Sequence, residues 1–253
     1  MRIDVLTLFP EMFESILGSA IFKRAGDRGL VRVVTRNIRD YTHDRHRTVD
    51  DYPYGGGAGM VLKPEPVFEA VEAARGEIIA ENPDIYKEDI PVILLTPQGR
   101  LLSQETASSY AGAENIVLIC GHYEGVDERI REHLVTDEIS IGDYVLSGGE
   151  TAAMVVMDAI IRLVPGVLGS EESSVEESHS NGLLEYPHYT RPPVFREWEV
   201  PEILLSGHHA NVAEWRRDQS IRRTARKRPD LLDKAELTAE EKQMAEGLRK
   251  PYK

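Results

Sequence analysis

The chain has 253 residues, of which 41% are hydrophobic, and its formal net charge is −13. This length suits one large domain or two unequal ones, and this composition excludes a disordered or collagen-like chain. The single cysteine, Cys120, excludes an internal disulfide framework and a cysteine-based zinc cluster, which fits a reducing, cytoplasmic environment. The longest apolar stretch, residues 152–168, contains Asp158 and Arg162 and therefore predicts no membrane span. The N-terminal segment predicts a strand rather than a cleavable signal.

The negative charge is unevenly distributed along the chain. Residues 23–47 carry eight Lys and Arg against three Asp, and residues 206–228 carry seven against two acids. Residues 65–89 carry eight acids against two bases. Two basic segments in an acidic chain indicate surfaces that attract a polyanion. The alternative interpretation is two solvated helix faces.

Aliphatic runs and helical patterns alternate over the first two thirds of the chain. The runs at residues 92–95 and 116–119 are continuous, which is typical of strands buried on both faces of a parallel sheet. Between them, residues 103–111 predict a helix with Ser103 as its N-cap. The other elements we expect are strands at 3–8 and 30–36, a helix from Pro10, and helices at 126–134 and 149–163. This alternation predicts an α/β domain over residues 1–168.

The character of the sequence changes at Gly169. Residues 169–185 begin with a polar, acidic, Ser-rich stretch that predicts a flexible linker. A Pro-rich extended segment and two helical patterns follow, the first of them basic and spanning 208–227. The second opens with Thr238 and Glu241 in the spacing of a capping box. We therefore expect a small helical domain over residues 186–253.

Three Gly-containing loops follow predicted strands, at residues 95–99, 120–125 and 139–150. In a parallel sheet, ligands bind beyond the carboxyl ends of the strands. Loops of this composition suit a ligand held largely by backbone amides and carbonyls. The alternative is that they are ordinary turns, and their spacing alone does not name a ligand.

Other candidate motifs favour no metal or nucleotide site. Residues 54–59 are Gly-rich but lack the ending of a P-loop, and they predict a tight loop that meets a partner closely. His43 and His46 have nearly zinc-ligand spacing without the helical context of a metalloprotease, and surface histidines are the favoured interpretation. The same holds for residues 208–209. Cys120 lies in an aliphatic run, where a buried, inert thiol is expected.

Basic side chains recur one turn apart along the expected helix at 208–227, with Trp215 among them. This pattern suits contacts to the phosphates of RNA or DNA. The alternative is a solvated helix that Trp215 anchors in a core. The candidate contacts are Arg216, Arg217, Arg222 and Arg223.

Seven motifs together resemble the bacterial tRNA (guanine-N1)-methyltransferases, whose members methylate the guanine just 3′ of the anticodon. They occur in order across nearly the whole chain. The motifs are TLFPEMF (7–13), DDYPYGGGAGMV (50–61), CGHYEGVDER (120–129), SIGDYVLSGGE (140–150), PGVLG (165–169), LEYPHYTRP (184–192) and LLSGHH (204–209).

The resemblance implies the SPOUT fold, an α/β domain with a deep trefoil knot and a parallel sheet covered by helices. It implies that the three loops bind S-adenosylmethionine. Because loops lined by backbone hold a ligand closely, we expect a side chain at Gly149 to block this ligand sterically. The resemblance also implies a homodimer with active sites at the subunit interface, and a C-terminal domain that grips the anticodon stem-loop of tRNA rather than DNA. Asp50 is implied as a further RNA contact. The implied cofactor-binding residues are Thr96, Pro97, Gly121, Tyr123, Glu124, Ile141, Gly142, Asp143, Tyr144, Val145, Leu146, Gly148 and Gly149.

The implied reaction is methylation of N1 of the guanine at tRNA position 37. A base must take the N1 proton, and the charge that develops on O6 needs a cationic partner. In the family these roles fall to a linker carboxylate and an arginine, which match Glu177 and Arg162 here. The family's carboxylate is usually Asp, so Glu176 stays open as the alternative base. Two other hypotheses stay open: a non-catalytic RNA-binding protein on this fold, and a SPOUT methyltransferase that acts on another RNA or atom.

Overall fold

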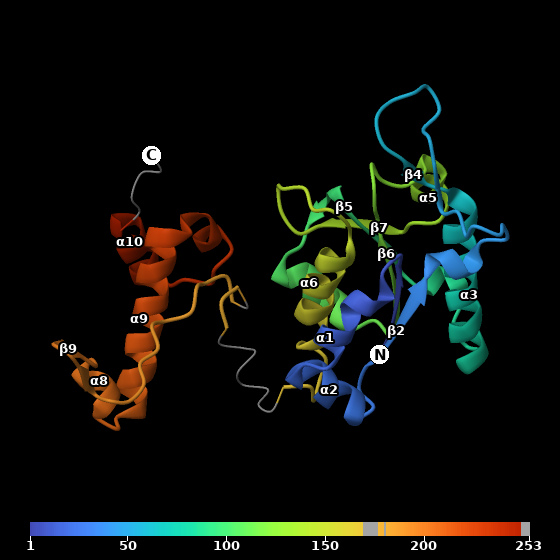
Figure 1. Ribbon diagram of the computed structural model, residues 1–253. Coiled ribbons are helices and arrows are strands. Elements are labelled where there is room, and N and C mark those ends of the chain that lie inside the picture. Colours follow the sequence, from blue (N-terminus) through green and yellow to red (C-terminus); the bar gives the residue numbers. More distant parts are fainter. Residues whose placement is uncertain (169–176, 180, 249–253) are drawn as a thin grey trace. The chain divides into compact units, whose positions relative to one another are not determined.

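The computed structural model describes residues 1–168, 177–179 and 181–248 (Figure 1). The chain divides into two compact units, residues 1–169 and 170–253. Each unit has its own hydrophobic core and is described by itself.

The first unit is built on a five-stranded sheet in the order β2-β1-β6-β5-β7, and all neighbouring strands are parallel. This confirms the predicted parallel sheet. Two further strands of two residues each, β3 and β4, form a separate antiparallel pair. The strands are β1 (Arg2–Thr7), β2 (Arg32–Asn37), β3 (Asp50–Asp51), β4 (Val61–Leu62), β5 (Val92–Leu101), β6 (Asn115–Cys120) and β7 (Asp137–Ser140).

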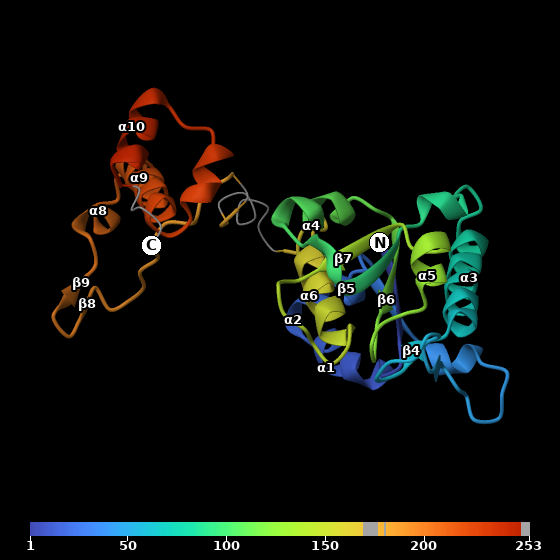
Figure 2. The same ribbon diagram turned by 90° about the horizontal axis from the view of Figure 1, so that it is seen from above.

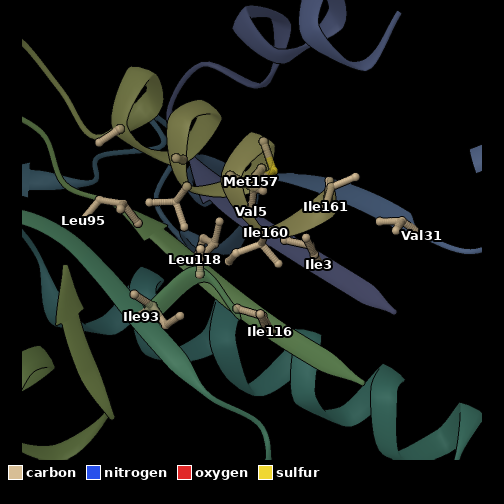
Figure 3. Packing of buried hydrophobic residues seen from close by; sticks show 14 of the residues in the cluster. Ile3, Val5, Val31, Ile93, Leu95, Ile116, Leu118, Met157, Ile160 and Ile161 are labelled. Atoms are coloured by element: carbon tan, nitrogen blue, oxygen red, sulfur yellow. The ribbon is translucent and has the colours of Figure 1, made fainter. Parts of the chain in front are cut away.

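The central strands are buried on both faces, as their continuous aliphatic runs predict. Because successive side chains of a strand point to opposite faces, β6 contributes Ile116 and Leu118 to one core and Val117 and Ile119 to the other. Figure 3 shows the first core. There, Ile116 and Leu118 share one cluster with Met157, Ile160 and Ile161 of a covering helix.

Helices cover both faces of the sheet (Figures 1 and 2). One face packs against α2, α4 and α6, and the other against α3 and α5. The Ser103 hydroxyl accepts a hydrogen bond from the Thr106 amide, which confirms the predicted N-cap. The helix expected from Pro10 is a 3-10 turn over Pro10–Phe13 followed by the single turn α1. The helices are α1 (Glu14–Leu17), α2 (Ala20–Asp27), α3 (Pro64–Glu81), α4 (Gln104–Ala111), α5 (Glu128–His133) and α6 (Glu150–Ile161).

Helix α3 lies in the acidic segment at residues 65–89, where the charge pattern predicted no helix. Its carboxylates pair with basic residues of the first basic segment. Arg36, whose side chain is 9% exposed, binds both Glu77 and the fully buried Asp4, and exposed Arg32 binds Glu81. Part of the basic charge in residues 23–47 is therefore neutralised within the unit.

The second unit contains a short hairpin of β8 (Val194–Phe195) and β9 (Trp198–Glu199), and the helices α8 (Glu202–Leu205), α9 (His209–Lys227) and α10 (Ala239–Leu248). The amide of Thr238 donates to Glu241, and the amide of Glu241 donates to the Thr238 hydroxyl. This reciprocal pair confirms the predicted capping box. Within the described part of the chain, no helix is both long and apolar enough to cross a bilayer. The unit's core consists of Leu183, Ile221, Ala225, Leu232 and Ala245.

Candidate active site

A cavity of about 210 Å³ lies in the first unit, at the segments 95–99, 120–125 and 139–150 that were predicted to bind a ligand. Residues of all three segments line it, so the structure brings them together as expected for ligands of parallel sheets. The residues at 95–99 are not a loop, however, because β5 continues to Leu101. A register shift between Leu95 and Arg100 keeps this strand paired with β7.

Twelve of the thirteen predicted cofactor-binding residues line the cavity. Asp143 is the exception, although both its neighbours in the chain are lining residues. Tyr144 and Val145 are largely exposed, and Val145 reaches 83% exposure. The lining residues are Thr96, Pro97, Gly121, Tyr123, Glu124, Ile141, Gly142, Tyr144, Val145, Leu146, Gly148 and Gly149.

Gly149 packs directly against the backbone at the end of β6. A Cβ atom at this position would lie 2.7 Å from the Cα of Cys120 and 2.8 Å from the amide nitrogen of Gly121. Real Cβ atoms do not approach backbone so closely, so only glycine lets these two segments meet. A side chain at Gly149 would therefore push these two segments apart, and the expectation that it blocks a ligand stays a prediction.

The Gly-rich segment at 54–59 is linked to the cavity through Glu124. The Glu124 amide donates to the carbonyl oxygen of Met60 at 3.0 Å. Gly59 has a φ of +83°, and a Cβ atom there would lie 2.5 Å from the Glu124 side chain. The predicted tight loop thus meets the wall of the cavity. Glu124 is exposed, and it is the only carboxylate among the described lining residues.

Arg131 is a lining residue that was not predicted from the sequence motifs. Its side chain is 12% exposed and forms an ion pair with Glu138 on β7. Its Nη2 also donates to the Thr96 hydroxyl at 3.2 Å. Arg131 therefore orients a predicted cavity residue. No local sequence signal indicates this, because 35 residues separate the two partners.

Buried polar groups lie beneath the cavity wall. The Thr7 hydroxyl at the end of β1 donates to Oε1 of Glu150 at 2.7 Å, and both side chains are buried. Burial raises the pKa of the Cys120 thiol well above its ordinary value, and the nearby Glu150 carboxylate adds to the shift. Cys120 is therefore a poor nucleophile, as predicted. His122, which also lines the cavity, has its Nδ1 buried without a hydrogen-bond partner in the described chain.

The predicted basic helix in the second unit is α9, and the four arginines predicted to contact RNA have intramolecular partners. Arg217 pairs with Glu241, and Arg222 pairs with Asp218. Arg216 stacks over the ring of Tyr186, 4.6 Å from its centroid, and Arg223 donates to the Glu185 carbonyl. By contrast, the last turn of α9 exposes Arg226 and Lys227, and neither forms an ion pair with any described residue.

Comparison with known proteins decides the family. Residues 1–234 match the family model described as tRNA (Guanine-1)-methyltransferase TrmD. The chain belongs to this family of methyltransferases. Proteins named tRNA (guanine-N(1)-)-methyltransferase are similar over nearly their full lengths. The protein of Dehalococcoides mccartyi strain 195 is 60% identical over 98% of this chain and 97% of its own. That of Brevibacillus brevis is 57% identical over 100% of both chains, and that of Bacillus cereus strain ATCC 14579 is 54% identical over 99% of both.

The two predicted catalytic residues of the methyltransferase belong to different units. Arg162 follows α6 directly as its C-cap and is partly buried in the first unit. Glu177 is partly buried at the start of the described part of the second unit. Each has an interaction within the chain. The alternative base, Glu176, lies outside the described residues.

The other candidate residues of the methyltransferase are the predicted RNA contact Asp50 and the histidines that were considered as metal ligands. Asp50 is partly exposed on β3. His43 binds the Glu69 carboxylate at 2.9 Å, so it interacts as a surface residue. His46, His208 and His209 are exposed. Across residues 1–168, 177–179 and 181–248, no three His, Cys, Asp or Glu side chains are grouped as ligands of a metal ion.

Proposed function

We propose that this methyltransferase transfers a methyl group from S-adenosylmethionine to N1 of the guanine at position 37 of tRNA, 3′ of the anticodon. The observation that carries the proposal is the cavity, where twelve residues expected from the family's motifs converge. The family match and the names of the similar proteins support tRNA as the substrate and guanine N1 as the target atom.

The residues of the cavity fit S-adenosylmethionine. This donor carries a cationic sulfonium, an adenine ring and an amino-acid end. Glu124 offers a carboxylate to cationic groups, while Leu95, Val126 and Ile139 offer apolar surface to the ring. The glycines of the wall leave backbone amides and carbonyls uncovered for hydrogen bonds. When bound, the donor supplies an electrophilic methyl group.

The catalytic groups of the proposal act on the guanine. N1 carries a proton that leaves only in basic solution, so a carboxylate must accept it for N1 to become nucleophilic. We assign this role to Glu177. The negative charge that then develops on O6 is stabilised by a guanidinium, which we assign to Arg162. Since the two residues come from different units, binding of tRNA is expected to complete the site.

The proposal includes the knotted SPOUT topology, a homodimer with its active sites at the interface, and a cytoplasmic location alongside tRNA. The close backbone contact of Gly149 with Gly121 supports direct packing of the two loops, which a knot requires. Exposed apolar side chains at the cavity, including Val145, support a covering partner surface. Basic Arg226 and Lys227 on α9 support contacts between the second unit and the anticodon stem-loop.

The test is to incubate the protein with S-adenosylmethionine and an unmodified tRNA transcript, and then to identify modified nucleosides by mass spectrometry. We expect 1-methylguanosine from a transcript with guanine at position 37, and none from a matched transcript with adenine at that position. Product that persists with the adenine transcript would show another target position. A product other than 1-methylguanosine would show another target atom. RNA binding without any product would favour a non-catalytic protein and overturn the proposal.

A further inference from the structure

Two polar side chains at the cavity, those of Glu150 and His122, have no role in the proposed proton transfer. Glu150 is only 2% exposed at the first position of α6, and His122 lies in the loop after β6. Nδ1 of His122 is fully buried and lacks a hydrogen-bond partner among the described residues. Buried polar atoms are nearly always paired, because an unpaired one costs about 1–3 kcal/mol. This atom therefore indicates an interaction that completes the site.

The carboxylate of Glu150 is held in place from the opposite side. The Thr7 hydroxyl donates to Oε1 over 2.7 Å and in turn accepts the amide of Phe9 at 2.9 Å, so the hydroxyl is committed to this geometry. The start of α6 adds the favourable field of a helix N-terminus. One oxygen of Glu150 is thus fixed, and no hydrogen bond in the described structure uses Oε2.

Oε2 of Glu150 and Nδ1 of His122 lie beside the same glycine. A Cβ atom built on Gly148 would clash with both atoms, and it would lie 2.6 Å from the His122 nitrogen. Because Gly148 has no side chain, nothing from this residue separates them. His122 and Gly148 also form an isolated antiparallel bridge, so the two cavity segments already run side by side here. Since the two atoms lie 2.4 and 2.6 Å from the Cβ position built on Gly148, their separation is at most 5.0 Å.

The His122 ring is confined on its other sides. Its centroid lies 5.2 Å from the ring of Phe9 and 4.6 Å from that of Tyr123, which it meets edge to face. A hydrogen bond at Nδ1 would select one orientation of this ring on the cavity wall. In neutral histidine it would also leave Nε2 as an acceptor.

We propose that Glu150 is a positioning residue that accepts the Nδ1–H of His122 and thereby holds residues 121–125 against residues 147–149 in the donor-binding arrangement. This inference rests on the proposed function, because it takes the ligand of the cavity to be S-adenosylmethionine. Neither residue exchanges a proton with the guanine. Their effect is on affinity for the methyl donor.

The test measures S-adenosylmethionine affinity by calorimetry. Glu150→Met removes both oxygens at similar volume, and we expect the affinity to fall at least about tenfold, the cost of a lost hydrogen bond to a charged group. Glu150→Gln keeps an acceptor oxygen and should recover most of the loss. Glu105→Gln is the matched control, since it removes an exposed first-turn carboxylate from α4 without touching the cavity.

Substitutions at His122 separate positioning from stability, because this residue is only partly buried. His122→Asn retains a donor near the Nδ1 position, whereas His122→Gln places its amide near the Nε2 position. We expect Asn to bind the donor more tightly than Gln. Combining Glu150→Met with His122→Gln should weaken binding no further than the single changes, because both remove one interaction. If Glu150→Met fails to fold, the Asn and Gln comparison alone decides.

A spectroscopic readout completes the test. In protein with ¹⁵N-labelled histidine and bound S-adenosylmethionine, the His122 signal, assigned by its loss in His122→Asn, should show a protonated Nδ1. An unprotonated Nδ1, equal affinities of the Asn and Gln variants, or a Glu150→Met variant that melts earlier but binds normally would each overturn the proposal. If the unaltered protein does not bind S-adenosylmethionine, the proposed function fails instead.

Discussion

The amide of Gly149 donates to the carbonyl oxygen of Gly121 at 2.7 Å, and its Cα faces the Gly121 backbone with no room for a side chain. This contact joins the segment before α6 to the segment after β6. Both segments supply walls of the cavity. The shape of the cavity therefore depends on a backbone-to-backbone contact.

We expect Gly149→Val to weaken S-adenosylmethionine binding and to lower the free energy of unfolding by about 1–3 kcal/mol, the usual cost of overpacking. Calorimetry and chemical denaturation measure the two effects. Gly121→Ala is the comparison, since its Cβ would lie 3.4 Å from the Leu95 carbonyl oxygen and needs only a slight shift. Gly149→Val with full stability but no binding would show that the side chain acts on the ligand directly.

Glu177→Gln should reduce single-turnover methyl transfer by roughly 10²–10⁴-fold, the usual share of general-base catalysis. The amide keeps the size of the side chain but does not accept the N1 proton. Glu177→Asp should retain much of the activity, because it keeps the carboxylate, and S-adenosylmethionine affinity should stay near normal in both variants.

Glu176→Gln is the matched control and should change the rate little. A loss of methyl transfer in Glu176→Gln alone would show that Glu176, and not Glu177, is the base. Normal turnover in both Gln variants would contradict a linker carboxylate as the base.

Arg226 and Lys227 should contribute more to tRNA affinity than the arginines nearer the middle of α9. Their charges are exposed and are not offset by described carboxylates, whereas Glu241 and Asp218 neutralise Arg217 and Arg222. Replacing Arg226 and Lys227 with Ala should weaken binding and flatten its slope against log salt by about 0.7–0.9 per phosphate contact.

The comparison for this prediction is Arg222→Ala. It should alter the salt slope less, because the charge it removes is already paired with Asp218. An unaltered slope in the variant that lacks both Arg226 and Lys227 would show that this end of α9 is a solvated helix face that does not contact RNA. A larger change in Arg222→Ala would show that the ion pair opens to bind RNA.

Glu77 makes the stability of the first unit depend on pH. Hydrogen bonding to Arg36, with a smaller contribution from Arg2, lowers the pKa of the Glu77 carboxyl from 4.5 to about 2. A depressed pKa means that the stabilisation is fully present above pH 4.5 and is lost as pH falls toward 2. Glu77→Gln should therefore cost about 1 kcal/mol at pH 7, since the side chain is 53% exposed and solvent screens the pair.

This cost should shrink as the pH falls from 4.5 to 2, where the unaltered carboxyl is itself protonated. Thermal unfolding at pH 7, 4 and 2.5 measures it. Glu72→Gln is the matched control on α3, because Glu72 is exposed and forms no ion pair in the described structure. A pH-independent difference between Glu77→Gln and the unaltered protein would contradict the assigned pairing.

Local patterns determined much of the architecture. Continuous aliphatic runs predict β5 and β6, because strands covered on both faces need no polar side. The Ser103 cap and the Thr238 capping box are equally local, since each bond spans three residues. Helix α3 is also encoded locally, with Pro64 in its first turn and buried Val67, Val71 and Ile78 along one face, but its dense charge obscured that pattern.

Only the tertiary structure decided which side chains meet. Thr7 and Glu150 are 143 residues apart, and Arg2 and Glu77 are 75 apart. Such contacts depend on which strand ends lie side by side in the order β2-β1-β6-β5-β7, and the period of a single segment carries no information about that order. The sequence thus predicted four of the five strands of the main sheet, the burial of its central strands and the three segments that line the cavity. Tertiary packing decided that Gly149 contacts the backbone of Gly121. It also decided that carboxylates of α3 form ion pairs with arginines of β2.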